Sequence, residues 1–546
     1  MLYGEAPVKT QCLPFRQIPH ASQLFTDFLS WVPPVRQFFP RPPNFSHWLK
    51  DETGRLRYDS AIRAQVSSVL EAQNKNWGAS SKALDNMARL RAGATAVVTG
   101  QQVGLFGGPL FSIFKALSAI KLAEQATAAG VDTVPVFWLA TADHDLAEIN
   151  NVNIPGPDGA LRNLATPTQS VPDAPVGSVS FGPEIDPVVE AAAGLLGESE
   201  IIGWLHESYR TGENFGSAFA RLFTRLFTEW GVVLLDASDP ELNRIAAPIY
   251  RAAIERAAEL DDALLARGKE LESAGYHQQV KVTPTSTLLF VLPDGARTVV
   301  HRRPNGSSEP DFLVGDGKIS QAKMLDEISS SAEHFSPNVL LRPVVQDYLL
   351  PTLAYTGGSA EVAYFAQAAV VYQTLLGRAT PVVPRFSATL VEPKQQALLE
   401  RYRMSLPDLF HGSDALRETL AVRTLPQELQ SAFEQADDVM KNSLAKIQDC
   451  LAHLDKTLVD AAINAGSKIH YQLDQLRSRA ARAELRQTEV LARHADLLSN
   501  MLYPNKALQE REIAGLYFVA RHGLGLLRDL YDAIHTDCLD HQIISL

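Results

Sequence analysis

The stretch of residues 94–150 constrains the fold of this chain more than any other. Residues 94–98 are an apolar strand pattern, and a glycine-rich segment, 99–109, follows directly. Apolar side chains then recur every three or four residues until Gly130, as in a buried helix, and residues 134–140 form a second apolar run. A strand, helix and strand in this order need a parallel pairing and a right-handed crossover, so both strands end at the same sheet edge. Ligands of open α/β sheets bind at that edge, which predicts a site there.

Further patterns extend this unit into an α/β core with a parallel sheet. Residues 231–236 form a short apolar run typical of a buried parallel strand. Residues 350–355 predict another strand, which a glycine turn joins to a helix capped by Ser359. A last strand-like run covers residues 379–391.

Two segments rich in proline, glycine and aspartate interrupt this core. The first, at about 155–230, combines a hairpin pattern with helices, and the second, at about 270–335, has alternating strand patterns separated by turn dipeptides. We interpret both as insertions. The core with its N-terminal segment and insertions is expected to cover residues 1–392.

A long helical hairpin is predicted after the core. Residues 427–503 contain no proline and are rich in Leu, Ala, Gln, Lys, Glu and Arg, a helical composition. An apolar seam recurs at intervals of three and four, as in a coiled coil, at Leu444, Ile447, Leu451, Leu454 and Leu458. A break at 464–467 would leave two antiparallel helices of roughly 35 residues, each about 50 Å long. We assign 393–512 to this helical domain and 513–546 to a segment that packs on the core, and we expect a symmetric homodimer.

Composition and charge exclude several classes of protein. The chain has 546 residues with 46% hydrophobic residues and a net charge of −12, so it can bury a large core but has no basic field for nucleic acid. The uncharged run 92–114 contains two glutamines, five glycines and a proline, so we do not expect a membrane span. The N-terminus has no secretory-signal pattern, which makes the cytoplasm the expected location. The three cysteines lie far apart and predict neither a disulfide framework nor a zinc site.

The glycine-rich segment after the first strand is the first candidate for ligand binding. Its spacing matches neither the dinucleotide nor the P-loop motif. Glycines just before a helix let backbone N–H groups approach a phosphate or carboxylate, although they can also serve tight packing. Polar side chains at the strand end join them. The candidate binding residues here are Thr99, Gln101, Gln102, Gly104, Gly107 and Gly108, whereas Lys115, two turns into the helix, is expected to be solvated.

The loop after the second strand carries the candidate catalytic residues Asp143, His144 and Asp145. Two carboxylates around an imidazole can raise the histidine pKa, hold its tautomer or bind a divalent cation such as Mg²⁺. Glu148 and Asn150 follow closely and are candidate substrate ligands. The alternative is a solvated loop.

Polar residues also gather around the glycine turn that follows the 350–355 strand. A carboxylate at a helix N-terminus either grips a substrate amine or only stabilises the helix dipole. An arginine after a proline at a strand end is a candidate fork for carboxylate or phosphate. The candidates are Gln346, Asp347, Tyr355, Gly357, Gly358, Glu361 and Arg385. The polar segment 504–511 is either surface or part of a nucleotide pocket, with candidates Asn505, Lys506, Gln509 and Arg511.

Several of these segments together resemble one family. They are TGQQVGLFGGP at 99–109, FWLA at 137–140 with DHD at 143–145 and EIN at 148–150, LRPVVQDYLLPT at 341–352, YTGG at 355–358 with Glu361, and PN with LQER at 504–511. In this order they are similar to the cysteine ligases of bacillithiol biosynthesis over nearly the whole chain. The family's usual Pro-Asn-Gly is Pro-Asn-Lys here, which removes the glycine at position 506.

The resemblance implies a fold and an activity. It implies a Rossmann-like core akin to class I aminoacyl-tRNA synthetases, with inserted connecting segments, plus a helical coiled coil used in dimerisation. It also implies addition of cysteine to the amine of glucosaminyl-malate. Amide formation in water is uphill, so the cysteine carboxylate must be activated, most simply by ATP, as an adenylate or an acyl phosphate. The HIGH and KMSKS signatures of the synthetases are not present.

Two other classes of function remain open from the sequence. The long helices are compatible with a scaffold or assembly protein whose core only binds a nucleotide, and the core alone is compatible with a sugar-nucleotide or nucleotidyl transferase. Thiol analysis of a strain lacking the gene separates these from the ligase, because only the ligase predicts loss of bacillithiol.

Overall fold

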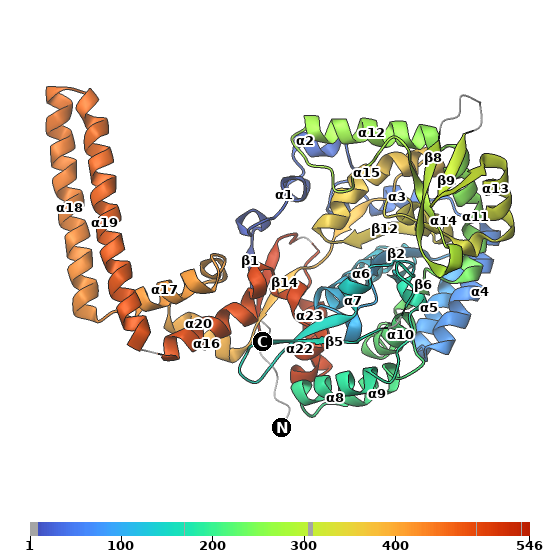
Figure 1. The fold of residues 1–546 in the computed structure, drawn as a ribbon, viewed down its shortest axis with the longest axis horizontal. Coiled ribbons are helices and arrows are strands. Elements are labelled where there is room, and N and C mark those ends of the chain that lie inside the picture. The colour runs from blue at the N-terminus through green and yellow to red at the C-terminus, as the bar shows by residue number, and fades with distance from the viewer. Residues whose placement is uncertain (1–8, 169, 304–309, 488, 537) are drawn as a thin grey trace. The chain divides into compact units, whose positions relative to one another are not determined.

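The computed structural model describes residues 9–168, 170–303, 310–487, 489–536 and 538–546. The chain forms two compact units (Figure 1). The first contains residues up to 155, 161–389 and 510–544, and the second contains 156–160, 390–509 and 545–546.

A five-stranded parallel sheet organises the first unit. Its order is β13-β12-β2-β3-β6, and its strands are β2 (Thr95–Gln101), β3 (Thr133–Leu139), β6 (Val233–Asp236), β12 (Thr352–Gly357) and β13 (Val382–Pro384). Along the chain, β2, β3 and β6 follow one another toward one edge of the sheet, and β12 and β13 then extend the sheet on the other side of β2. The sheet is therefore doubly wound, its switch point lies between β2 and β12, and the predicted α/β class is confirmed.

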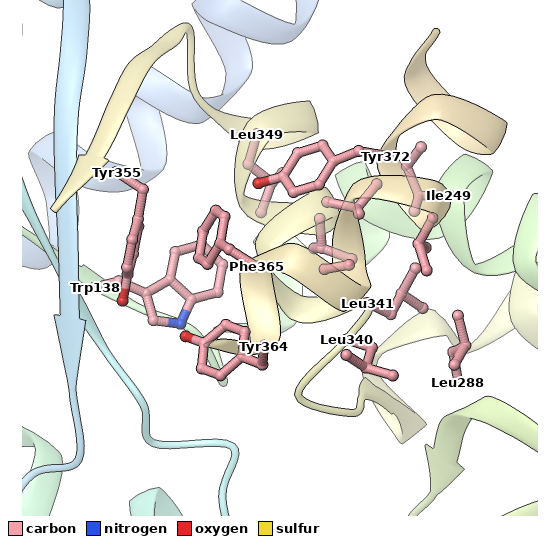
Figure 2. Close-up of a cluster of buried hydrophobic side chains, with 14 of the residues drawn as sticks. Trp138, Ile249, Leu288, Leu340, Leu341, Leu349, Tyr355, Tyr364, Phe365 and Tyr372 are labelled. Carbon is pink, nitrogen blue, oxygen red and sulfur yellow. The ribbon is translucent and has the colours of Figure 1, made fainter. Parts of the chain in front are cut away.

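Helices cover both faces of this sheet. Ala96 and Val98 point into one apolar core with α4, α11, α14 and α15, whereas Val97 points into a second core with α6, as the two-residue period of a strand requires. The helices of the first unit are α1 (Gln23–Leu29), α2 (Pro33–Arg36), α3 (Leu49–Arg55), α4 (Ser60–Asn76), α5 (Ser81–Ala92), α6 (Phe111–Ala128), α7 (Leu146–Ile149), α8 (Ile185–Leu196), α9 (Glu200–Ser208), α10 (Phe215–Leu226), α11 (Pro240–Glu255), α12 (Ala257–Ser273), α13 (Gln321–Ser330), α14 (Arg342–Leu349), α15 (Ser359–Leu376), α22 (Gly515–His522) and α23 (Gly525–Ala533). Figure 2 shows how the aromatic side chains of β3, β12 and α15 meet in the larger core.

Two further groups of elements lie between the strands of the parallel sheet along the chain. The first holds the hairpin β4 (Asn151–Pro155) and β5 (Leu161–Ala165), followed by α8, α9 and α10. The second is an antiparallel sheet of order β10-β9-β8-β7-β11, with strands β7 (Ser286–Val291), β8 (Thr298–Arg303), β9 (Asp311–Val314), β10 (Gly317–Ser320) and β11 (Phe335–Pro337).

Two local predictions around the last core strands were wrong. The single strand expected at 379–391 is two, because only β13 joins the parallel sheet, while β14 (Ala388–Val391) pairs in a sheet of order β1-β15-β14 with β1 (Lys9–Leu13) and β15 (His541–Ser545). Ser359 does not cap α15. Gly358 is the N-cap, and Glu361 reaches back to accept the Gly358 N–H at 2.7 Å.

The second unit is helical, as expected. It contains α16 (Pro393–Arg401), α17 (Ser413–Arg423), α18 (Gln427–Leu454), α19 (Thr457–Gln487) and α20 (Glu489–Leu502), and α21 (Gln509–Glu512) crosses the boundary back to the first unit. Helices α18 and α19 lie side by side in Figure 1.

The break between the two long helices is not where it was predicted. It lies at Asp455, the C-cap of α18, whose side chain accepts from the N–H of Thr457, the first residue of α19, at 2.9 Å. Gly466 lies inside α19, where a Cβ would come within 2.9 Å of Leu444 Cδ1. The glycine therefore permits close packing of the two helices and does not end one. None of the helices in the described ranges is long and apolar enough to span a membrane.

Candidate active site

A cavity of about 310 Å³ opens at the switch point between β2 and β12. We call it the polar cavity. Its walls come from the segments that follow these two strands, from the loop after β3 and from the starts of α6, α14 and α15. It is lined by Gly100, Gln101, Gln102, Phe111, Lys115, Asp143, Glu148, Val339, Arg342, Gly358, Ala360, Glu361, Tyr364, Arg385 and Arg511. Four cationic side chains and three carboxylates therefore meet at the edge where the sequence predicts a site.

Lys115 is a deeply buried charge of the polar cavity. Its Nζ donates to Glu361 Oε2 at 2.7 Å, and to Gly100 O and Gln101 Oε1 at 2.8 Å each. Burial lowers the pKa of Lys115 to about 8, while Glu361 acts in the opposite direction. The expectation of a solvated Lys115 was wrong, because α6 is covered on nearly all sides and this turn faces the sheet edge.

Glu361 ties the end of β12 to the start of α15. Besides Lys115 it accepts from the Gly358 N–H and from the Tyr355 hydroxyl. Burial acts to raise the pKa of Glu361, but Lys115 and these donors outweigh burial and hold it below its usual value. Glu361 is therefore an ionised partner of Lys115. The glycine turn, Gly357 and Gly358, brings the helix start close to the strand end.

Arg385 lines the polar cavity next to Gly358. Its Nη1 and Nη2 donate to Glu510 at 3.1 and 2.6 Å, and its side chain is only 5% exposed. Its Nε is buried and has no hydrogen-bond partner among the described residues. A Cβ on Gly358 would lie 3.4 Å from this Nε, so the glycine keeps the donor accessible from the cavity.

Arg342 and Arg511 complete the cationic part. Arg342 is the first residue of α14, and its Nη2 donates to the Tyr364 hydroxyl at 2.8 Å. Arg511 donates to Ser359 Oγ at 3.5 Å near the start of α15. Oxygen anions such as carboxylate and phosphate are the ligands that arginine forks recognise.

Asp143 and Glu148 form the acidic side of the cavity, joined by Gln102. The Gln102 amide donates to Asp143 Oδ2 at 3.1 Å and to Glu148 Oε2 at 2.7 Å. Burial acts to raise the pKa of Asp143, but the Arg297 charge and hydrogen bonds from the His144 N–H and Gln102 bring it below its usual value. Burial raises the pKa of Glu148, with a smaller opposing contribution from Gln102. Asp143 is thus the stable anion and Glu148 the better proton acceptor.

A second cavity, of about 370 Å³, shares Asp143, Val339 and Arg342 with the first. We call it the apolar cavity. It is lined by Trp138, Ala140, Ala142, Asp143, His144, Ala237, Leu242, Asn243, Tyr250, Val280, Phe290, Arg297, Pro337, Asn338, Val339, Arg342, Val345 and Leu349.

His144 lies on the apolar cavity beside Arg297. Arg297 Nη1 is 3.1 Å from His144 Nδ1 and 3.3 Å from Asp143 Oδ1, and its guanidinium stacks 3.9 Å from the centroid of the Phe290 ring. Because arginine only donates, His144 Nδ1 would be the acceptor in this contact. Burial lowers the pKa of Arg297 to about 10.

The glycine turn does not present its N–H groups to an anion as the sequence led us to expect. Gly107 N–H donates to the Tyr209 hydroxyl at 3.1 Å, and Gly108 N–H donates to Leu105 O at 3.0 Å. Gly107 has φ of 83° and packs against the side chains of α10. Gly104 is also buried, and a Cβ at this position would lie only 3.0 Å from the Gly108 Cα. These glycines serve packing, the alternative left open by the sequence.

Other predicted residues lie away from both cavities. Thr99 is fully buried and donates to Thr356 O, which links β2 to β12. Asp145 caps α7 by accepting the Glu148 N–H at 3.1 Å, so it has a structural role. Asn150 follows that helix and accepts from Asn151.

The candidates on α14 also lie outside the linings of both cavities. Gln346 and Asp347 are buried, and Asp347 pairs with Arg378 at 3.4 Å and accepts from the Thr380 hydroxyl. Burial raises the pKa of Asp347 to about 6. This pair anchors α14 and leaves Arg342, four residues earlier than Gln346, to face the cavities.

Of the four candidates at 504–511, Arg511 alone lines the polar cavity. Gln509 is buried and bonds Leu390 N and O in the second unit. Asn505 and Lys506 both have positive φ, 52° and 60°. Lys506 therefore has a left-handed backbone, a conformation that a glycine at this position would adopt without steric cost.

Sequence reasoning missed Arg342, Arg297 and Tyr364 and misplaced Lys115. Arg342 lies in the 341–352 segment that resembles the family and is the first residue of a helix, so its position could have indicated a site residue. For Arg297, inside the inserted sheet, no local pattern distinguishes it from a surface arginine.

Comparison with known proteins decides the family. Residues 8–386 match a family model described as bacillithiol biosynthesis BshC, N-terminal Rossmann-like domain, and residues 388–546 match one described as its C-terminal coiled-coil domain. The chain belongs to the BshC family. It is 49% identical over 535 residues to a protein of Koribacter versatilis, covering 98% of this chain and 99% of the relative. It is 36% identical to one of Solibacter usitatus, with the same coverage, and 32% identical to one of Salinibacter ruber, covering 96% of each chain. All three bear the name "Putative cysteine ligase BshC".

Proposed function

We propose that this protein joins the carboxylate of cysteine to the amine of glucosaminyl-malate, with ATP as the activating substrate, to form bacillithiol. The names of its relatives support a cysteine ligase that acts on small molecules. The observation that carries the proposal is the polar cavity, where four cations face three carboxylates at the switch point of a doubly wound sheet.

The cationic side fits the anionic groups of these substrates. Lys115, Arg342, Arg385 and Arg511 line one cavity, and the Nε of Arg385 is a buried donor that awaits an acceptor among the described residues. A buried unpaired donor costs free energy that a phosphate or carboxylate oxygen would recover. The residues present therefore fit ATP, and ATP supplies a leaving group for the cysteine carboxyl when bound.

The acidic side fits an amine that must lose a proton. Asp143 stays ionised and can hold a substrate ammonium, whereas Glu148, with its raised pKa, is the better base. In the ligation step the amine nitrogen of glucosaminyl-malate forms a bond to the cysteine carbonyl carbon, the bond from that carbon to the activating oxygen breaks, and the nitrogen passes a proton to Glu148. Asp143 and His144, two of the three predicted catalytic residues, would then orient the substrates.

Mg²⁺ would arrive with the nucleotide. Phosphate oxygens, waters and one or two carboxylates hold Mg²⁺ in such sites. Asp143, the ionised carboxylate on the acidic side of the polar cavity, would be the protein's ligand to Mg²⁺. In the described ranges no group of three or more His, Cys, Asp and Glu is arranged to hold a metal ion by itself.

The test is reconstitution with the purified protein. Cysteine, glucosaminyl-malate, ATP and Mg²⁺ should give bacillithiol and one equivalent of AMP or ADP, measured by mass spectrometry. Lys115→Met should lower kcat/KM by about 10²-fold, because it removes a buried cation from the cavity. Arg528→Met, at an exposed ion pair with Glu229, is the matched control and should retain the full rate.

Two results would reject the proposal. A protein that binds ATP but consumes none in the presence of both other substrates would favour the nucleotide-binding scaffold. A strain lacking the gene that retains normal bacillithiol would exclude the ligase in the cell.

A further inference from the structure

The apolar cavity is larger than the polar cavity, and apart from Asp143, His144 and Arg342 its lining residues have no role in the chemistry described so far. Three aromatic residues, Trp138, Tyr250 and Phe290, contribute to its lining together with aliphatic side chains. Cavities of this size with mostly apolar walls and a few fixed polar groups are typical of small-molecule sites.

One donor in this lining is unused. Trp138 lies on β3 and is 3% exposed, and its Nε1–H has no hydrogen-bond partner within the described ranges. Figure 2 shows this indole among the side chains of Tyr355, Tyr364 and Phe365 in the core, and Trp138 also lines the apolar cavity. Buried tryptophan N–H groups usually find an acceptor, so the cavity side is where a ligand would supply one.

Two other polar side chains of the apolar cavity, Tyr250 and Asn338, make hydrogen bonds within the protein. The Tyr250 hydroxyl donates to Asn243 Oδ1 at 2.6 Å, and Asn338 Oδ1 accepts the Leu340 and Leu341 N–H groups at 3.0 Å each. The walls are thus preformed. They favour an uncharged, flat group with hydrogen-bond acceptors on its edge.

The position of this cavity decides among the substrates. It shares Asp143, Val339 and Arg342 with the polar cavity, so one molecule can place an apolar end in one and an anionic end in the other. Cysteine has no apolar part large enough for the site, and glucosaminyl-malate is polar over its whole surface. A nucleoside triphosphate combines a flat heteroaromatic base with a chain of phosphates.

We propose that the apolar cavity binds the base and ribose of ATP, with the phosphates directed past Arg342 into the polar cavity. This inference rests on the proposed function for the use of ATP. In it, Trp138 donates to an acceptor of the nucleoside, and Tyr250 and Phe290 form its apolar surroundings.

The experiment compares ATP with inorganic tripolyphosphate as calorimetric probes of the full-length protein. Trp138→Phe keeps the ring but removes the N–H, and Ala237→Leu fills part of the cavity. Each should weaken ATP binding roughly tenfold, the loss of about one hydrogen bond or of a well-fitted contact. Neither should change the affinity for tripolyphosphate, which has no base. Trp230→Phe, at a buried tryptophan outside both cavities, is the matched control and should bind ATP as the unaltered protein does.

The outcomes separate this inference from the proposed function. Unchanged ATP affinity in both cavity variants, with folds confirmed by circular dichroism, would overturn the nucleoside site while leaving ATP-dependent ligation intact. Equal weakening of ATP and tripolyphosphate would also overturn it, because the effect would then not depend on the base. A higher KM for glucosaminyl-malate with unchanged ATP binding would assign the cavity to the amino sugar instead. Absence of any ATP binding to the unaltered protein would reject both proposals.

Discussion

Removal of the Glu510 carboxylate tests whether its buried ion pair with Arg385 stabilises the polar cavity. Glu510 is 1% exposed at its side chain and is the partner of Arg385. It also accepts from Ser387 Oγ at 3.0 Å and from the Ala388 N–H at 3.1 Å. Burial acts to raise the pKa of Glu510, but Arg385 outweighs it and keeps the group ionised. Glu510→Ala leaves the Arg385 charge buried and uncompensated.

Breaking a buried ion pair by removing one partner costs about 3–5 kcal/mol. We therefore expect Glu510→Ala to lower the free energy of unfolding of the first unit by about that amount. Urea denaturation followed by tryptophan fluorescence measures it, because all six tryptophans lie in that unit. Glu229→Ala, which breaks an exposed pair with Arg528, is the control and should leave the urea midpoint nearly unchanged.

A double variant tests the reason for the loss. Arg385→Met combined with Glu510→Leu removes both charges, so it should be less destabilised than Glu510→Ala alone. A loss below about 1 kcal/mol in Glu510→Ala would refute the reasoning, since it would mean that solvent reaches Arg385. A double variant no more stable than the single one would show that packing, and not the unpaired charge, sets the loss.

Three further predictions concern pH and assembly. As the proposed base, Glu148 with its raised pKa requires kcat/KM to fall as pH drops through that pKa. Glu148→Gln should remove this acidic limb of the pH profile, and an unchanged limb would assign the proton transfer to another residue. Burial lowers the pKa of His541 to about 4 from 6.5, so between these pH values the unfolded chain binds a proton at His541 that the folded protein excludes. The free energy of unfolding should therefore fall as pH drops below 6.5. In urea denaturation at about pH 5 to 7, His541→Gln should flatten this dependence on pH, and an unchanged slope would contradict the buried neutral state. In the apolar seam of α18, Ile447 is 49% exposed and Leu454 is 78% exposed, so we predict that a second copy covers them in a dimer. In light scattering, the double variant Ile447→Lys with Leu454→Lys, or deletion of 427–503, should convert this dimer to a monomer. A full-length protein that is monomeric at micromolar concentration would refute the prediction.

The sequence determined the layout of the core and the edge where its polar residues gather. Strand periodicity and the βαβ order of residues 94–150 are local properties, and the chirality of the crossover then places the ends of β2 and β3 together. The polar residues after these strands, Gln101, Gln102 and Asp143, do line one cavity. Proline-free helical composition likewise identified the long helices, although the cap at Asp455 and not Gly466 separates them.

Only the tertiary structure decided which side chains face the cavities. The helical period places Lys115 on a face of α6, but the sheet edge and Glu361, 246 residues later, make that face a buried ion-pair site. A glycine at position 107 would let a backbone N–H approach an anion, but this N–H donates to the hydroxyl of Tyr209 from the first insertion. Arg297 reaches the apolar cavity from the second insertion. Local patterns report turns, periods and helix ends, whereas the partner of a charge or an N–H is set by segments hundreds of residues away, which pack only when the whole chain has folded.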